Sequence, residues 1–127
     1  MQTSPSSDHS SLFNSPPEFT IADSQLADGG VLLTIAGELD IATVPVVRER
    51  LARLTAAGAR RLVVDLRRVA FMDSTGLAAF IHTKLQLGDE GELTLVLEPD
   101  SYARLIFEVA GLVGVLEVVD TLDAAIA

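Results

Sequence analysis

The residues of this chain best suited to chemistry stand together in one short stretch. An acid, two hydroxyls and a glycine follow one another there: Asp73, Ser74, Thr75 and Gly76. An apolar run at residues 62–66 precedes them and predicts a strand, and a helical pattern begins near Leu77. Backbone N–H groups at a helix N-terminus lack partners inside the helix and favour negative charge. A serine in such a turn can therefore cap the helix, or it can carry a phosphate.

Two interpretations of this turn follow from the residues alone. In the structural one, Asp73 or Ser74 caps the helix, which contributes about 1 kcal/mol. In the functional one, Ser74 or Thr75 accepts a phosphoryl group. The two interpretations are compatible, because one hydroxyl can cap the helix in one state and carry phosphate in the other.

Other chemistries at this turn lack the residues they need. His82 lies eight residues beyond Ser74, a rise of about 12 Å along one helix, so it cannot be the base of a serine hydrolase. The chain has no cysteine and two histidines, which argues against a zinc site. The sequence predicts no catalytic residue, no metal and no cofactor.

A receiver domain is a further alternative, because Val63-Val64-Asp65-Leu66 resembles the strand that ends in the phosphoacceptor aspartate of that family. Receiver chemistry needs Mg²⁺ held by acids at the end of an earlier strand, with a lysine nearby. The single lysine, Lys84, falls inside a predicted helix, and no acidic pair ends an early strand. The sequence therefore disfavours this alternative.

Length and composition restrict the class of protein. With 127 residues, 49% of them hydrophobic, the chain suits one domain with a single aliphatic core. No apolar run approaches the roughly 18 residues needed to cross a bilayer, and no secretory signal precedes the first strand. We expect a soluble, cytoplasmic protein without a membrane partner. A net charge of −9 argues against a nucleic-acid partner.

The charges are distributed unevenly along the chain. Seven of the nine basic residues fall in residues 48–68, and nine of the eighteen acids fall in residues 89–127. These charges either form solvated faces or offer a basic and an acidic surface to a protein partner.

The chain divides into an N-terminal tail and one folded unit. Residues 1–17 are rich in Ser and Pro, which predicts a disordered tail, and residues 18–127 form the predicted domain. Five strands are predicted at residues 18–23, 31–36, 61–66, 93–97 and 115–119. Four helices are predicted: from a cap at Thr43 to Gly58, over 75–87, from Pro99-Asp100 to Gly111, and after a cap at Thr121.

This alternation predicts an α/β sandwich with a mostly parallel sheet and one antiparallel N-terminal strand. Sites in such sheets gather at the carboxyl ends of strands, so we expect Asp40 close to Asp73 and Ser74. Phe71 and Met72 are predicted to be core residues. The predicted inward positions of the second and third helices are Leu77, Phe80, Ile81 and Leu85, and Leu105, Ile106 and Val109.

Two motifs resemble a known family. Phe71-Met72-Asp73-Ser74-Thr75-Gly76-Leu77 is similar to the phosphorylation site of the STAS domains of bacterial anti-sigma factor antagonists. Gly37-Glu38-Leu39-Asp40 resembles the strand end that precedes the first helix of that family. The two occur in the family's order, and the resemblance covers residues 18–127.

The resemblance implies a partner switch without catalysis by the chain itself. The unphosphorylated chain would bind an anti-sigma factor, a serine kinase, and so release a sigma factor. The kinase would phosphorylate Ser74, the hydroxyl directly after the acid, and a PP2C-type phosphatase would reverse the modification. The residues implied at the partner surface are Asp40, Glu38, Asp73, Thr75, Gly76 and Leu77. For Leu77, burial in the core is the alternative.

The same family leaves two other functions open. STAS domains also serve as scaffolds in stress-signalling assemblies and as accessory subunits of lipid ABC transporters. A decoy antagonist that binds the kinase without being phosphorylated is a further alternative.

Overall fold

The computed structural model describes residues 18–127, so the predicted tail at residues 1–17 lies outside the described residues. The strands are β1 (Thr20–Gln25), β2 (Val31–Leu39), β3 (Arg61–Met72), β4 (Glu92–Val96) and β5 (Glu117–Val119). The helices are α2 (Val44–Ala56), α3 (Ser74–Leu87), α4 (Tyr102–Val109) and α5 (Leu122–Ile126), with a short 3₁₀ turn at Gly88–Glu90.

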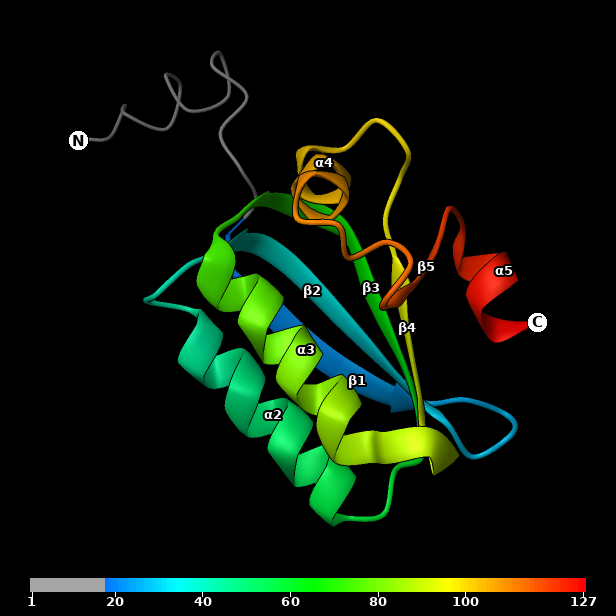
Figure 1. Cartoon of the computed structure of the whole chain (residues 1–127). Helices are drawn as coiled ribbons and strands as arrows, with labels where there is room; N and C mark the ends of the chain where they lie inside the picture. The colour runs from blue at the N-terminus through cyan, green and yellow to red at the C-terminus, as the bar shows by residue number, and fades with distance from the viewer. Residues whose placement is uncertain (1–17) are drawn as a thin grey trace.

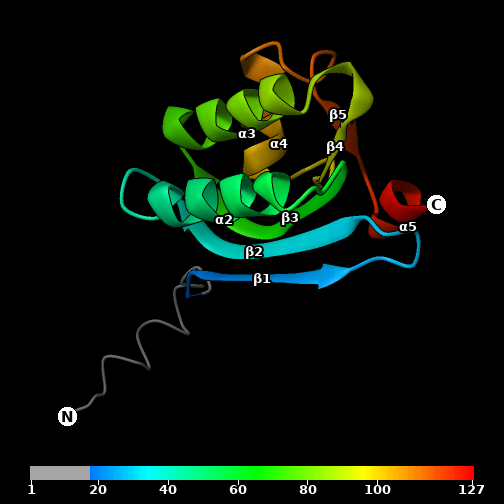
Figure 2. The same ribbon diagram turned by 90° about the horizontal axis from the view of Figure 1, so that it is seen from below.

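The five strands form one sheet in the order β1-β2-β3-β4-β5 (Figure 1). β1 is antiparallel to β2, and the other three pairs are parallel. The predicted mixed α/β sandwich is therefore confirmed. α2 and α3 lie side by side on one face of the sheet, as both views show (Figures 1 and 2).

Alternate residues of β3 face opposite sides of the sheet. Leu62 and Val64 belong to the main core, whereas Val63 packs with Val96 and with Ala125 of α5 on the other face. The main core is aliphatic except for Phe80 and Phe107, each with 0% exposure. The core is mostly aliphatic because the strands contain almost no aromatic residues.

β2 and β3 extend further than the sequence predicted, to Leu39 and Met72. Their pairing continues through two register shifts, between Thr34 and Ala36 and between Gly37 and Glu38. β4 pairs only with the first half of β3, so α4 packs beside the second half (Figure 1). β1 is displaced by two residues from its predicted position, and β5 is shorter than predicted.

The expected burial of α3 is correct for Phe80 and wrong for Leu85, which is 74% exposed. Leu77 and Ile81 are half-buried against the core. The buried stripe runs through Gly76, Ala79, Phe80, Thr83 and Leu87. Since this stripe is rotated from the predicted one, Leu85 falls on the outer side of the helix.

The expected inward face of α4 is also wrong. The structure buries Ala103 and Phe107, while Leu105 is 50% exposed and Val109 is 78% exposed. Ile106 is half-buried. Ala103 and Phe107 lie four positions apart and so share the face that packs against β3. The prediction followed the large aliphatic residues instead.

Phe71 was predicted as a core residue and lies at the surface, 36% exposed. Its ring stacks on Tyr102 of α4 with centroids 5.8 Å apart and planes 14° apart. Met72 is buried as predicted. In residues 18–127, no helix has the length and apolar character needed to cross a bilayer.

Candidate functional site

The ends of β2 and β3 meet at one edge of the sheet. Leu39 pairs with Met72, and the N–H of Asp73 donates to the carbonyl of Leu39 at 3.0 Å. The turn that enters α2 and the turn that enters α3 therefore start side by side. The prediction that Asp40 lies at the same sheet edge as Asp73 and Ser74 is confirmed.

Asp73, rather than Ser74, caps α3. Its backbone is extended (φ −106°, ψ −174°), and its carboxylate accepts a hydrogen bond from the N–H of Thr75 at 2.9 Å. The hydroxyl of Thr75 donates to the same carboxylate oxygen. The pKa of Asp73 lies below its usual value, chiefly because of the Thr75 hydroxyl, with N–H groups of Thr75, Gly76 and Ile41 adding to the effect against desolvation. This carboxylate is therefore ionised at neutral pH.

Ser74 is the first residue of α3 and is exposed. Because Asp73 supplies the cap, the Ser74 hydroxyl makes no hydrogen bond within residues 18–127. A hydroxyl that is exposed and unbonded can reach the active site of another protein. Its position at a helix N-terminus also favours an added negative charge.

Asp40 holds the loop between β2 and α2. Its carboxylate accepts hydrogen bonds from the N–H groups of Ala42 at 2.9 Å and Thr43 at 3.2 Å. Thr43 stands at the predicted cap position, but its hydroxyl makes no cap bond to α2. That hydroxyl instead donates to the carbonyl of Glu38 at 2.7 Å and accepts from the N–H of Asp40 at 3.0 Å. Asp40 is half-buried and Glu38 is exposed.

Gly76 lies beneath the surface of the turn and packs between α3 and the strand ends. A Cβ there would lie 2.7 Å from Cγ of Met72 and 3.5 Å from Cβ of Leu39. The absent side chain therefore lets α3 approach the sheet, and Gly76 itself is buried. Leu77 is half-buried and packs against the main core.

Sequence reasoning missed Ile41, which is 78% exposed between Asp40 and the α2 turn. Its N–H is one of the groups that lower the pKa of Asp73, so it lies at the same sheet edge. A large aliphatic residue in an otherwise polar turn was the signal that could have identified it.

Asp65, the residue of the receiver alternative, is buried and paired. Arg67 donates from Nε at 2.9 Å and from Nη2 at 2.8 Å to its two carboxylate oxygens. Burial raises the pKa of Asp65, but these bonds outweigh burial and leave the pKa below its usual value. Both oxygens are thus engaged in an internal ion pair. Within residues 18–127, no three His, Cys, Asp or Glu side chains gather as a metal site would require.

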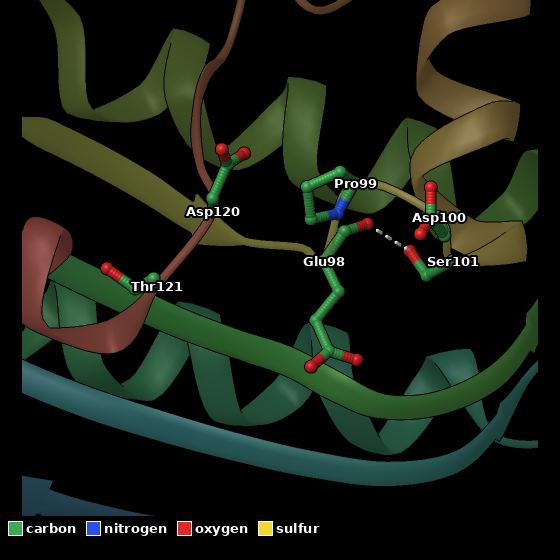
Figure 3. A pocket seen from close by; sticks show the side chains of 6 residues that line it. All are labelled: Glu98, Pro99, Asp100, Ser101, Asp120 and Thr121. Carbon is green, nitrogen blue, oxygen red and sulfur yellow. Dashed lines mark hydrogen bonds between the residues drawn. The ribbon is translucent and has the colours of Figure 1, made fainter.

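A hollow of about 600 Å³ opens beyond the ends of β4 and β5 (Figure 3), and none of the predicted site residues lines it. Its lining includes Glu98, Asp100 and Asp120, and Ser101 donates to the carbonyl of Glu98 at 2.9 Å. Asp120 accepts from Arg104 at 2.7 Å. The carboxylates of this lining would repel an anionic ligand.

Comparison with known proteins identifies the family. A model of the STAS domain matches residues 22–125. An anti-sigma-B factor antagonist of Staphylococcus aureus is 39% identical over 85 residues, which cover 66% of this chain and 78% of the relative. One from Bacillus subtilis is 36% identical over 92 residues, covering 72% and 83% of the two chains.

The fold also matches a solved structure. An anti-sigma factor antagonist from Mycobacterium paratuberculosis superposes with a TM-score of 0.78 at 28% identity, covering 85% of this chain and 91% of the other. The chain belongs to the STAS domain family, as its two motifs indicated. The relatives are named for a regulatory role and not for a reaction.

Proposed function

We propose that this chain is an anti-sigma factor antagonist. In its unphosphorylated state it binds an anti-sigma factor that is a serine kinase, which frees a sigma factor for RNA polymerase. Phosphorylation of Ser74 ends the interaction, and a PP2C-type phosphatase restores it. The names of the relatives support the antagonist role, and the free, exposed hydroxyl of Ser74 is the observation that supports the switch.

The electrostatics of the turn support a switch at an interface. Phosphorylation adds a charge of about −1.5 to −2 at pH 7. Asp73 beside it is ionised, and Asp40 stands at the neighbouring strand end. A partner docked over this surface would have to bury a concentrated negative charge, which disfavours the complex.

The fold itself has little reason to change on phosphorylation. The cap of α3 is supplied by Asp73, so a phosphate on Ser74 removes no hydrogen bond within residues 18–127. The helix N-terminus also favours the added charge. The switch therefore acts on partner affinity and leaves the domain folded.

The proposed contact surface surrounds Ser74. Glu38 and Asp40 present polar groups at the end of β2, and Asp73 and Thr75 present them at the start of α3. Leu77 adds a half-buried apolar contact. The burial of Gly76 gives it an indirect role, since it sets how closely α3 approaches the strands. We infer a cytoplasmic location from this proposed function, because sigma factors act there.

The test is phosphorylation by candidate kinases. The full chain is incubated with ATP, Mg²⁺ and each purified anti-sigma serine kinase from the same genome, and intact mass is recorded. We expect a single gain of about 80 Da that maps to Ser74. Binding without a gain in mass would indicate a decoy antagonist. If no kinase binds or modifies the chain, and the chain is instead recovered in a large assembly or with an ABC transporter, the antagonist proposal is wrong. The scaffold or transporter role would then be favoured.

A further inference from the structure

A second surface feature lies between α2 and α3. It is a shallow hollow of about 160 Å³. Its lining is Arg48 and Ala52 from α2, and Ala79, His82, Thr83 and Gln86 from α3. We call it the α2–α3 groove. These six residues are distinct from the residues of the proposed switch.

The residues at the bottom of the groove have small side chains, and the buried hydroxyl among them already has a hydrogen-bond partner. Ala52 and Ala79 leave space where the two helices pack against each other. Thr83 is buried, and its hydroxyl donates to the carbonyl of Ala79 at 2.9 Å. The polar groups left to meet a ligand are therefore those of the rim.

The rim carries hydrogen-bond donors and no acid. Arg48 offers a guanidinium, His82 an imidazole and Gln86 an amide. No Asp or Glu lines the groove. A guanidinium at the edge of a small hollow suits a carboxylate, which it can bind through two parallel hydrogen bonds.

Arg48 is free to make such a bond. Five other arginines of residues 18–127 form ion pairs: Arg50 with Asp23, Arg60 with Glu90, Arg61 with Asp28, Arg67 with Asp65, and Arg104 with Asp120. Arg48, like Arg53 and Arg68, forms none within the same part of the chain. In a chain of net charge −9, acids are abundant, yet none of those in residues 18–127 forms an ion pair with Arg48.

The groove is close enough to Ser74 to share its partner. α2 and α3 begin at the same end of the sheet and run side by side (Figures 1 and 2). Ala79 lies about 7.5 Å along α3 from Ser74, and His82 about 12 Å. An ordinary interface covers about 800 Å² on each partner, roughly 30 Å across. A protein centred on Ser74 would therefore cover the groove as well.

We propose that the α2–α3 groove receives an acidic side chain of the kinase that docks over Ser74. The volume of about 160 Å³ equals roughly five water molecules, which suits one Asp or Glu side chain. The partner then presents a basic group opposite the anionic turn and an acid opposite Arg48. This arrangement fixes its orientation on α3. The inference rests on the proposed function and adds the site that orients the kinase.

The experiment measures the Kd of the unphosphorylated full chain for the kinase that phosphorylates Ser74. Arg48→Glu should weaken binding at least tenfold, because it turns the attraction for an acid into repulsion. Arg53→Glu is the matched control, since it makes the same change on the same helix outside the groove lining. We expect it to alter the Kd less than twofold.

Ala52→Leu tests the groove without any change of charge. The larger side chain occupies the hollow, and we expect at least a fivefold loss of affinity. The thermal midpoint of each variant is measured to verify that it is folded. If Arg48→Glu does not fold, the Ala52→Leu result still decides.

Each result has a distinct meaning. Equal losses in Arg48→Glu and Arg53→Glu would indicate a general electrostatic field and overturn the inference. Wild-type affinity in Arg48→Glu or Ala52→Leu, with Ser74 still phosphorylated, would overturn the inference and leave the proposed function standing. A wild-type chain that no kinase binds would overturn both.

Discussion

The turns that enter α3 and α4 each place a serine at the start of a helix after a parallel strand, yet they use it differently. Ser101 caps α4: its hydroxyl accepts from the N–H of Arg104 at 3.1 Å and donates to the carbonyl of Glu98 at 2.9 Å. Ser74 stands one position inside α3, and Asp73 makes the cap in its place. A serine whose hydroxyl is engaged in the fold is poorly placed for modification, whereas Ser74 is relieved of that role.

The same two turns also differ in the residue at the third position after the cap. In α3 it is Gly76, which allows close approach of the helix to Met72. In α4 it is Arg104, whose guanidinium donates to the carbonyl of Leu97 at 3.1 Å and to Asp120 at 2.7 Å. The first turn is thus packed tightly beneath an exposed hydroxyl, and the second is held by a polar network.

The largest expected effect is on phosphorylation. Ser74→Ala should abolish kinase-dependent phosphate incorporation, because the variant lacks the acceptor oxygen. Ser101→Ala should incorporate phosphate as the wild type does. Intact mass after a timed reaction measures both. Stoichiometric phosphate on Ser74→Ala would show that another hydroxyl is the acceptor.

The next effect is on partner affinity. Ser74→Asp places a charge where the phosphate would stand and should weaken kinase binding roughly tenfold or more. Its free energy of unfolding should change by less than about 0.5 kcal/mol, because an acid in the first turn of a helix is tolerated. Isothermal titration and urea unfolding measure the two quantities. A large stability loss in this variant would indicate instead that Ser74 has a structural role.

Gly76→Ala tests the close packing of α3. The new Cβ would lie 2.7 Å from Cγ of Met72, so that side chain must move, at a cost of about 1–3 kcal/mol. Urea unfolding measures the loss. In a Met72→Ala background the penalty of Gly76→Ala should shrink, since the clashing atoms are gone. An unchanged penalty in the Met72→Ala background would show that the new Cβ clashes with atoms other than those of Met72.

The caps themselves give a smaller effect. Asp73→Ala should lower the free energy of unfolding by about 1–2 kcal/mol and Ser101→Ala by about 1 kcal/mol, because each removes a helix cap. Ser74→Ala should lower it by less than about 0.5 kcal/mol. The three are compared in one urea series. A loss in Ser74→Ala as large as that in Ser101→Ala would contradict the division of roles between the two turns.

The smallest effect concerns pH. The pKa of Asp73 is lowered in the folded protein, so its ionised form adds stability above the ordinary aspartate range, and this is lost as pH falls through the folded pKa. Asp73→Asn keeps a capping side chain, and its deficit relative to wild type should be fully present at pH 6 and fade below about pH 4. The deficit of Ser101→Ala should stay constant, because serine does not titrate. If the stability deficits of Asp73→Asn and Ser101→Ala depend on pH in the same way, the charge of Asp73 adds nothing to the free energy of unfolding.

Much of the fold could be predicted because strands and turns leave local patterns. The apolar runs of β3 and β4 and the glycines between elements placed the sheet, and the predicted antiparallel first strand was correct. The motif that contains Ser74 could be located for the same reason, since its residues are consecutive. A model of the STAS domain matches residues 22–125, a range that includes this motif.

The faces of two helices could not be predicted from local pattern. Leu85 and Val109 are apolar, yet both face solvent, because the rotation of each helix is set by what it packs against. Ala103 and Phe107 are buried in the helix that packs on β3, and the second half of β3 has no β4 partner. Phe71 lies at the surface, where its ring stacks on that of Tyr102.

The sequence by itself determined the order of the elements, the charge of the chain and the acid-hydroxyl-hydroxyl-glycine turn, because these depend on neighbours along the chain. Only the tertiary structure decided that Asp73 makes the cap, and that within the described part of the chain the Ser74 hydroxyl makes no hydrogen bond and no acid pairs with Arg48. Such outcomes depend on contacts between segments far apart in sequence, such as the bond from the N–H of Asp73 to Leu39. The spacing of apolar residues along the chain does not reveal those contacts.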